Sequence, residues 1–379
     1  MTNENRVDKT VLIEAAVRQN SGFNGVWLAA SSSAQPVKTL WHSVTGFGCP
    51  VPTFEEGWLN NSGGAPMATK KIVPLSWVAL DPDYANRAGY DPDFLGIKVP
   101  VPKLSKELKR KATLGVLAYE HFSVLLNPDR RLAFWTAVNI DGANEKRLAN
   151  RAADAWWTDD RDKGAFKPYQ VTNTFYRTSG FERGHLVRRL DPAWGADDDE
   201  AARGEADSFH FSNCSPQIPA LNKQWWGKIE KHVLDTANAN DQQICVFSGC
   251  LFTDADPTYK KLKIPLAFWK VVAWTVGTGN PKLKSLAFFV KQDEAVAKLI
   301  KAKGVQPLAV ELGTVPEAIQ GYQTTVAELA AQTGLSFGDL AKEDVDVYAG
   351  KRANRLAPLA FNAIDVYRRL RRPSDLFTE

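Results

Sequence analysis

The chain has 379 residues, 44% of them hydrophobic and 24% charged, a balance typical of a globular protein with a substantial core. A net charge of +4 permits a nucleic-acid partner but does not require one, so the case for nucleic acid depends on where basic residues cluster. Four cysteines at this length argue against a disulfide scaffold, and we expect reduced, mostly buried thiols.

Residues 1–95 are expected to form a small N-terminal module of unknown role. Residues 9–20 have helical spacing, whereas the stretch from Asn20 to about Pro74 is rich in Gly, Ser, Pro and Trp and predicts short strands and loops. We see no secretory signal at the start and no apolar run of about 18 residues, so we expect a soluble, cytoplasmic protein without membrane contact.

Residues 96–350 predict one α+β domain, followed by a helical tail over 351–379. The runs HFSVLLN and RLAFWTAVNI flank Pro128-Asp129-Arg130 and predict an antiparallel hairpin. Apolar residues four apart predict a helix over 219–240. Further strands are expected at 244–252, 264–276 and 283–292, and further helices at 316–333 and 355–371. Hairpins mixed with long crossovers favour a central antiparallel sheet flanked by helices.

The segment Tyr176–Asp191 is the most informative part of the sequence, because it places four arginines around one histidine, His185. The planar guanidinium of arginine suits phosphate oxygens, and a neutral histidine near pH 7 can accept a proton from water. Taken alone, this cluster is also consistent with an exposed arginine-rich strand end that carries an incidental histidine.

Asn222 lies 37 residues after His185, early in the helix predicted over 219–240. Glu230 follows eight positions later, about 80° around the helix, so both side chains can border the same side. One neutral oxygen ligand supplemented by water suits Mg²⁺, and a nearby carboxylate could hold the metal-bound water.

These residues together resemble a known family. Phe181-Glu-Arg-Gly-His-Leu, followed by Asn213-x-x-Pro-Gln, Asn222 and Glu230, is similar to the signature of the DNA/RNA non-specific endonucleases. This is the ββα-metal group of Serratia-type and endonuclease G-like nucleases. The resemblance covers about residues 95–350, and its elements occur in the family's order.

The resemblance implies cleavage of DNA and RNA to 5′-phosphate ends without sequence preference. His185 would be the general base and Asn222 the ligand of one Mg²⁺, with Mn²⁺ as a substitute. Glu230 would be a further catalytic residue. Arg183 and Arg188 would bind phosphate. Asn213 would contact substrate or brace its loop, and Arg161 matches an upstream substrate-binding position more weakly. Glu182 stands where the family has Asp, which leaves its role in positioning the histidine uncertain.

Several other residues have plainer interpretations. His121 and His210 are expected to be packed or hydrogen-bonded core histidines, and Trp225-Trp226 to be core. The acidic run Asp197–Glu200 is expected to be a solvated loop, although such a run can also attract a metal ion. The basic stretch Tyr367–Arg372 is expected to be a helix end.

Two alternatives to an active, unregulated nuclease stay open. The domain could be catalytically weak and act as a binding protein, or it could be a regulated effector such as a bacterial defence or toxin nuclease. In the first, catalysis would be lost through Glu182 and residues 1–95 would carry the binding function. In the second, residues 1–95 would control the nuclease by binding a regulatory partner. A homodimer is a further expectation, by analogy with the family alone.

Overall fold

The computed structural model describes residues 72–73, 83–148, 156–277, 279–302, 320–343 and 368–371. All of them belong to the second of two compact units, Met1–Ala65 and Pro66–Glu379. The predictions for residues 9–20, for nearly all of 20–74 and for most of the tail 351–379 lie outside the described residues. Within the described ranges, no helix combines the length and apolarity needed to cross a membrane.

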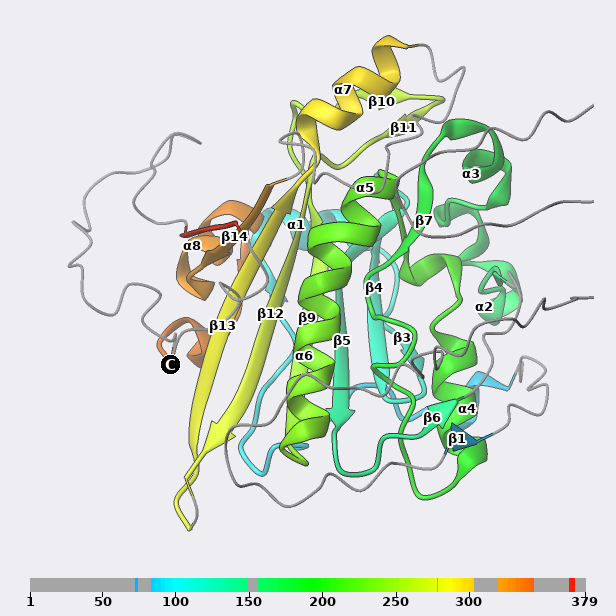
Figure 1. Cartoon of the computed structure of the whole chain (residues 1–379). Helices are drawn as coiled ribbons and strands as arrows, with labels where there is room; N and C mark the ends of the chain where they lie inside the picture. The colour runs from blue at the N-terminus through cyan, green and yellow to red at the C-terminus, as the bar shows by residue number, and fades with distance from the viewer. Residues whose placement is uncertain are drawn as a thin grey trace, which may run out of the picture. The chain divides into compact units, whose positions relative to one another are not determined.

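An eight-stranded antiparallel sheet forms the centre of the described domain (Figure 1). In spatial order its strands are β16 (Arg368–Leu370), β14 (Gln320–Thr324), β13 (Lys282–Lys291), β12 (Ala267–Val276), β9 (Gln243–Leu251), β5 (Leu132–Asp141), β4 (Phe122–Asn127) and β3 (Leu117–Tyr119). The long strands are rich in aromatic and β-branched residues, which suit a pleated, buried surface. The predicted α+β class, the hairpin β4–β5 and the strands β9, β12 and β13 are confirmed.

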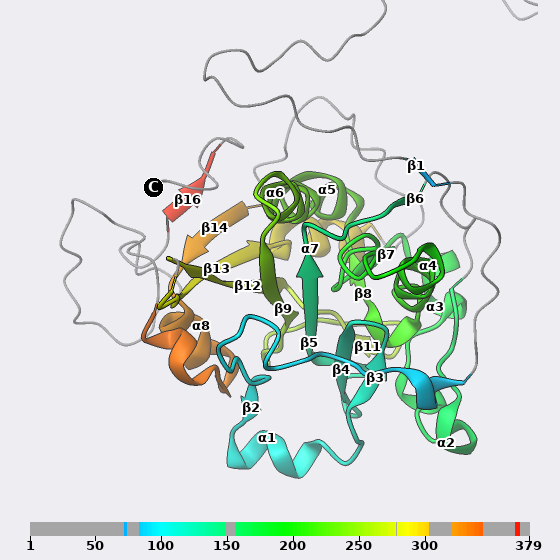
Figure 2. The ribbon, with the colours of Figure 1, turned by 90° about the horizontal axis from the view of Figure 1, so that it is seen from below.

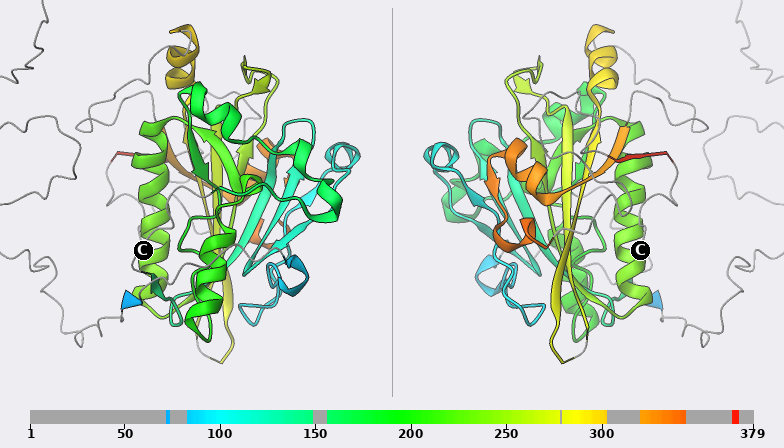
Figure 3. Two further views of the ribbon diagram at one scale, coloured as in Figure 1. Left: turned by 90° about the vertical axis from the view of Figure 1, so that its right-hand side faces the viewer. Right: turned by 90° about the vertical axis from the view of Figure 1, so that its left-hand side faces the viewer.

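Both faces of the sheet are buried, which explains why its central strands are apolar along most of their length. Successive side chains point to opposite faces, so Phe268 and Trp269 belong to two different core clusters. Helix α6 (Gly227–Ala239) covers one face, and α8 (Val326–Thr333) covers the other (Figures 2 and 3).

Capping side chains set where several helices begin. Ser105 caps α1 (Lys106–Lys111), Thr325 caps α8, and Asp197 caps α4 (Asp198–Asp207) by accepting from the backbone N–H of Glu200 at 2.8 Å. The expectation of a solvated loop at Asp197–Glu200 is therefore wrong, because these carboxylates form the cap and first turn of a helix, where its dipole favours them. The other helices are α2 (Arg161–Gly164), α3 (Asn173–Ser179) and α7 (Asp293–Lys301).

Short strand pairs complete the described domain. They are β1 (Ile72–Val73) with β6 (Arg147–Leu148), β2 (Lys103–Leu104) with β15 (Leu335–Ser336), and β10 (Thr258–Tyr259) with β11 (Leu262–Lys263).

Two helix predictions near the C-terminus are wrong in part. Of the helix expected over 316–333, residues 320–324 form β14, and the helix begins only after the Thr325 cap. Of the helix expected over 355–371, residues 368–370 form β16, which pairs with β14. In both places, backbone pairing with a distant strand overrides the local helical pattern.

The predicted boundary at residue 95 does not coincide with the edge of the packed domain. Tyr90 and Leu95 are buried in the core cluster beneath α8. Arg87 forms an ion pair with Asp207 at 2.6 Å, and both side chains are only 1% exposed. Residues 84–95 therefore pack as part of the main domain.

A ββα element stands beside the large sheet (Figure 1). Strand β7 (Glu182–His185) pairs antiparallel with β8 (Cys214–Gln217). The chain then enters a helix made of α5 (Pro219–Leu221), a π-helical turn over Asn222–Trp226, and α6. Gly184 allows the close approach of the two strands, because a Cβ there would lie 2.1 Å from the Gln217 side chain. The ββα arrangement and the helix over 219–240 are confirmed.

Candidate active site

Strand β7 carries three of the predicted site residues, Glu182, Arg183 and His185. Because strand residues alternate between faces, Arg183 and His185 share one face and Glu182 points to the other. Trp156 packs beside both members of the shared face: its ring lies 5.7 Å from the Arg183 guanidinium carbon and 4.6 Å from the His185 ring. Phe209 contacts the same imidazole edge-on at 5.0 Å. These aromatic contacts hold the half-buried His185 ring in place.

Two hydrogen bonds tie the helix after β8 to β7. Asn222 Nδ2 donates to Glu182 Oε2 at 2.9 Å, and Trp226 Nε1 donates to the backbone oxygen of His185 at 3.0 Å. Asn222 and Trp226 are four residues apart and so face the same side of the helix. The start of the helix therefore lies along β7 and is bonded to the first and the last residue of that strand.

The Glu182 contact also determines which atom Asn222 can offer to a cation. A carboxylate only accepts hydrogen bonds, so the amide nitrogen of Asn222 must face Glu182. The amide oxygen, Oδ1, is then the atom that can bind a metal ion. A single neutral oxygen supplemented by water is a donor set that Mg²⁺ accepts. The chemistry of the site therefore fits the predicted metal at Asn222.

A hollow of about 420 Å³ lies between β7, α3 and the helix. Glu182, Arg183 and Asn222 line it, whereas His185 does not and instead contacts Trp156, which forms part of its wall. Arg177 and Lys223 add two further positive charges. Lys223 forms an ion pair with Glu182 at 2.7 Å, and Arg183 donates to Asn173 at 2.9 Å. Three cations around one carboxylate give the hollow a positive character that suits a phosphate group.

Glu230 does not line this hollow. Its carboxylate is buried and faces Lys270 of β12, with the Nζ atom 3.9 Å from Oε1. Burial raises the pKa of Glu230 to about 8, although the nearby positive charge of Lys270 opposes the shift. Burial lowers the pKa of Lys270 and raises the pKa of the neighbouring Asp191. The structure therefore places Glu230 in a buried charge cluster, and its role at the metal stays a prediction.

Lys270 connects that cluster to the segment that follows His185. Its Nζ atom donates to the backbone oxygen of Leu186 at 3.2 Å and to Ser248 Oγ at 2.7 Å. The sequence motifs around His185 and Asn222 do not predict this role for Lys270. The available signal was a lysine in the middle of the apolar run LAFWKVVAW, where a charge must find buried partners.

The three residues predicted to bind substrate elsewhere in the sequence do not line the hollow either. Arg188 lies close to Asp191 and Glu230, where its positive charge opposes the rise that burial causes in the pKa of both carboxyl groups, so it is part of this charge cluster. Arg161 donates to both carboxylate oxygens of Asp159 and to the backbone oxygen of Ala118. Its hydrogen bonds are thus used within the protein.

Asn213 is fully buried and braces the loop after His185. Its Oδ1 accepts from the backbone N–H of Val187 at 2.8 Å. Its Nδ2 donates to the backbone oxygens of Val187 and Ser208, each at 2.9 Å. Of the two roles expected for Asn213, the contacts match bracing and leave no exposed surface for substrate.

The plainer interpretations are confirmed for several other residues. His121 and His210 are buried and hydrogen-bonded, and Trp225 and Trp226 belong to the core. The three cysteines in the described part of the chain are buried and free: Cys214, Cys245 and Cys250.

Comparison with known proteins places these elements in a family. The model of the DNA/RNA non-specific endonucleases matches residues 103–344. An uncharacterized protein of Sinorhizobium fredii is 35% identical over 291 residues, covering 72% of this chain and 42% of that protein. Mitochondrial endonuclease G of Bos taurus is 29% identical over 191 residues, covering 47% of this chain and 58% of the relative. The chain therefore matches about half of the length of these two relatives.

A protein of Nostoc named as a nuclease is 25% identical over 227 residues, covering 56% of this chain and 74% of the relative. A crystal structure of an EndoG/EndoGI complex aligns with 64% of this chain and 94% of the compared chain, at 17% identity and a TM-score of 0.42. Because the family model matches well over half of the sequence, including the whole ββα element, the chain belongs to the DNA/RNA non-specific endonuclease family.

Proposed function

We propose that this chain is a metal-dependent, sequence-non-specific endonuclease that hydrolyses phosphodiester bonds in DNA and RNA. His185 acts as the general base, and Asn222 holds one Mg²⁺ or Mn²⁺. The observation that carries the proposal is the hydrogen bond from Asn222 to Glu182, because it joins the helix with the metal ligand to the strand with the base. Membership of the endonuclease family supports the same reaction class.

His185 performs the proton transfer. Its neutral ring accepts a proton from a water molecule, whose oxygen bonds to phosphorus as the bond to the 3′ oxygen breaks. The leaving 3′ oxygen gains a proton, so the products carry a 5′-phosphate and a 3′-hydroxyl. The packing of the ring against Trp156 and Phe209 keeps it oriented through the step.

Arg183, Arg177 and Lys223 hold the phosphate in the hollow, where the arginines offer paired N–H donors. A divalent ion on Asn222 Oδ1 would neutralise charge on the phosphate and on the leaving oxygen. Because these groups contact the backbone and not the base edges, little sequence preference is expected. Lys270 supports the site by donating a hydrogen bond to the peptide oxygen that follows His185, and Glu230 lies beside Lys270.

The test is cleavage of single- and double-stranded DNA and RNA by purified protein, with Mg²⁺ or with EDTA. His185→Ala should lower the rate about 10²–10⁴-fold, as loss of a general base does, while substrate binding in EDTA persists. Asn222→Ala should need much more Mg²⁺. His232→Ala and Asn240→Ala are matched controls, because each residue lies ten or more positions after Asn222 along the chain and outside the hollow. Near-normal cleavage by His185→Ala would exclude the mechanism.

The same assay separates the alternatives. A binding protein or a regulated effector would show no Mg²⁺-dependent cleavage as the full chain alone, whereas the proposed enzyme cleaves without a partner. The homodimer and a regulatory partner of residues 1–95 remain predictions, to be checked by measuring the mass of the protein in solution.

A further inference from the structure

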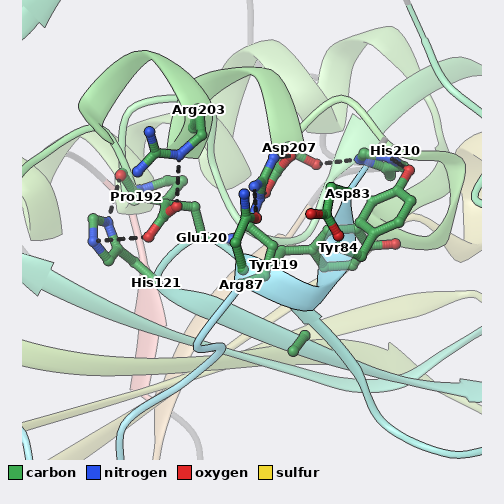
Figure 4. Close-up of polar contacts among 12 residues, drawn as sticks. Asp83, Tyr84, Arg87, Tyr119, Glu120, His121, Pro192, Arg203, Asp207 and His210 are labelled. Carbon is green, nitrogen blue, oxygen red and sulfur yellow. Dashed lines mark hydrogen bonds and ion pairs between the residues drawn. The ribbon is translucent and has the colours of Figure 1, made fainter. Parts of the chain in front are cut away.

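A second group of metal-ligating side chains lies outside the proposed active site. Glu120 and His121 form the turn between β3 and β4, and Glu200 lies in the first turn of α4. None of the three lines the hollow at Glu182 and Asn222. Figure 4 shows Glu120 and His121 side by side beneath α4, with Pro192 and Arg203 next to them.

One atom of each side chain faces a common point. His121 Nε2 lies 3.0 Å from Glu200 Oε1 and 3.6 Å from Glu120 Oε1, and the three ligand atoms all lie within 4.8 Å of one another. Two ligands bound to one ion at about 2.0–2.2 Å in tetrahedral geometry lie about 3.4 Å apart. The two separations from His121 Nε2, 3.0 Å and 3.6 Å, are close to this value.

The other polar atom of each side chain is held by the protein. His121 Nδ1 donates to the backbone oxygen of Pro192 at 3.0 Å. Glu120 Oε2 accepts from Arg203 Nε at 2.9 Å, and Glu200 Oε2 accepts from the backbone N–H of Ala196 at 2.7 Å. Such outer contacts are typical of metal ligands, because they fix the histidine tautomer and the carboxylate orientation.

Packing around the cluster adds to this orientation. Trp194 stacks on the His121 ring at 3.6 Å with an interplanar angle of 12°. Gly195 has φ +145°, a conformation that side chains rarely adopt, and a Cβ there would lie 2.4 Å from the Glu200 carboxyl carbon and would displace that carboxylate. Glu120 and His121 are buried.

The arrangement of acceptor atoms favours a positive charge at the common point. With its proton on Nδ1, a neutral His121 presents an Nε2 lone pair to two carboxylate oxygens, and three acceptors repel one another unless something positive lies between them. Either a second proton on the ring or a metal ion supplies that charge. Two carboxylates offset by the single charge of Arg203 leave room for a divalent ion.

We propose that Glu120, His121 and Glu200 form a structural zinc site that joins the β3–β4 turn to α4. An imidazole nitrogen with two carboxylate oxygens suits Zn²⁺, whereas Mg²⁺ prefers oxygen ligands and retains its water. The site is separate from the proposed nuclease centre, and its role is to stabilise the edge of the sheet next to β3. It stands whether or not the chain cleaves nucleic acid.

The experiment uses the full chain, stripped with EDTA and dialysed into Mg²⁺ at millimolar concentration. The stripped protein is incubated with ZnCl₂, excess zinc is removed, and the zinc bound per chain is measured by inductively coupled plasma mass spectrometry. The melting temperature is measured with and without ZnCl₂. We expect one Zn²⁺ per chain and a higher melting temperature. Glu200→Gln, which keeps the shape of a partly exposed side chain, should weaken zinc binding by more than about 100-fold, beyond the usual effect of losing an outer contact.

Controls assign the zinc to this site. Asp199→Asn removes an exposed carboxylate from the same helical turn and should bind zinc as the wild type does. His185→Ala should also retain the zinc, which excludes binding at the nuclease centre. A wild-type protein that binds no zinc would overturn the proposal. Equal zinc binding by Glu200→Gln and the wild type would overturn it as well.

Discussion

Replacing Glu182 by alanine should weaken metal binding, so that cleavage needs more Mg²⁺, without unfolding the protein. Glu182 makes two contacts, a hydrogen bond from Asn222 Nδ2 at 2.9 Å and an ion pair with Lys223 at 2.7 Å. The first fixes the amide of Asn222 with its oxygen available to a cation. Without it, the amide can rotate, and the favoured ligand orientation is no longer selected.

The size of the effect follows from these two contacts. A hydrogen bond to a charged acceptor contributes about 1.5–3 kcal/mol, which corresponds to roughly 10–100-fold in metal affinity. The ion pair is exposed on the Lys223 side, at 56%, and such pairs contribute about 0–1 kcal/mol. Glu182→Ala should therefore raise the Mg²⁺ concentration for half-maximal cleavage by about 10–100-fold, and Lys223→Ala should change it much less.

The assay is cleavage of plasmid DNA over a Mg²⁺ titration, with circular dichroism as the check on folding. Glu182→Gln keeps an acceptor without the charge and should fall between alanine and the wild type. The reasoning would be refuted if Glu182→Ala showed the Mg²⁺ dependence of the wild type, or if Lys223→Ala shifted it by the same amount.

Three further predictions concern stability and reactivity. Asn213→Ala removes hydrogen bonds to three buried backbone groups, at about 1–3 kcal/mol each, so urea unfolding should show a loss of at least about 3 kcal/mol; a loss below about 1 kcal/mol would contradict the bracing role. The pKa of Glu230 is raised to about 8, so its contribution to stability is fully present below its unfolded pKa of about 4.5 and is lost as the pH rises through 8. The free energy of unfolding of the wild type, relative to Glu230→Gln, should therefore fall between pH 5 and pH 9; a constant difference would rule out the shifted carboxyl group. Burial raises the pKa of three thiols, those of Cys214, Cys245 and Cys250, so a thiol reagent should modify them only after unfolding. Rapid labelling of more than one thiol in the native chain would contradict their burial.

The sequence was sufficient for the elements whose patterns are local. The hairpin of β4 and β5 and the strands β9, β12 and β13 follow from aromatic and β-branched runs. The helix after β8 follows from apolar residues at every fourth position. The motif around His185 predicted the β7–β8 pair only through its resemblance to a family.

What the sequence could not provide depends on contacts between distant segments. The position of β14 between β13 and β16 is a matter of strand pairing across the domain, and the local pattern of 316–333 favours a helix instead. Arginine suits phosphate, so Arg188 and Arg161 were predicted to bind substrate. Arg161 instead donates to Asp159, two positions earlier, and Arg188 lies near Asp191 and the distant Glu230. The burial of Glu230 could be predicted only by knowing that Lys270 lies opposite it.

The acidic run Asp197–Glu200 was misinterpreted for a different reason. Acidic residues are favoured both in solvated loops and in the first turn of a helix, and the capping role of Asp197 distinguishes the two. The partner of Glu200 is His121, 79 positions earlier in the sequence. No spacing rule could have joined these two residues.

Strand β16 has a practical consequence for shortened versions of this protein. The family match ends at residue 344, but Leu370 of β16 is 2% exposed and pairs with Gly321 of β14. A protein trimmed to the matched region would lose this partner and leave the backbone N–H and C=O groups along the outer side of β14 open to another chain. Aggregation of such a fragment would then reflect a missing strand, and would say nothing about the intrinsic stability of the nuclease domain.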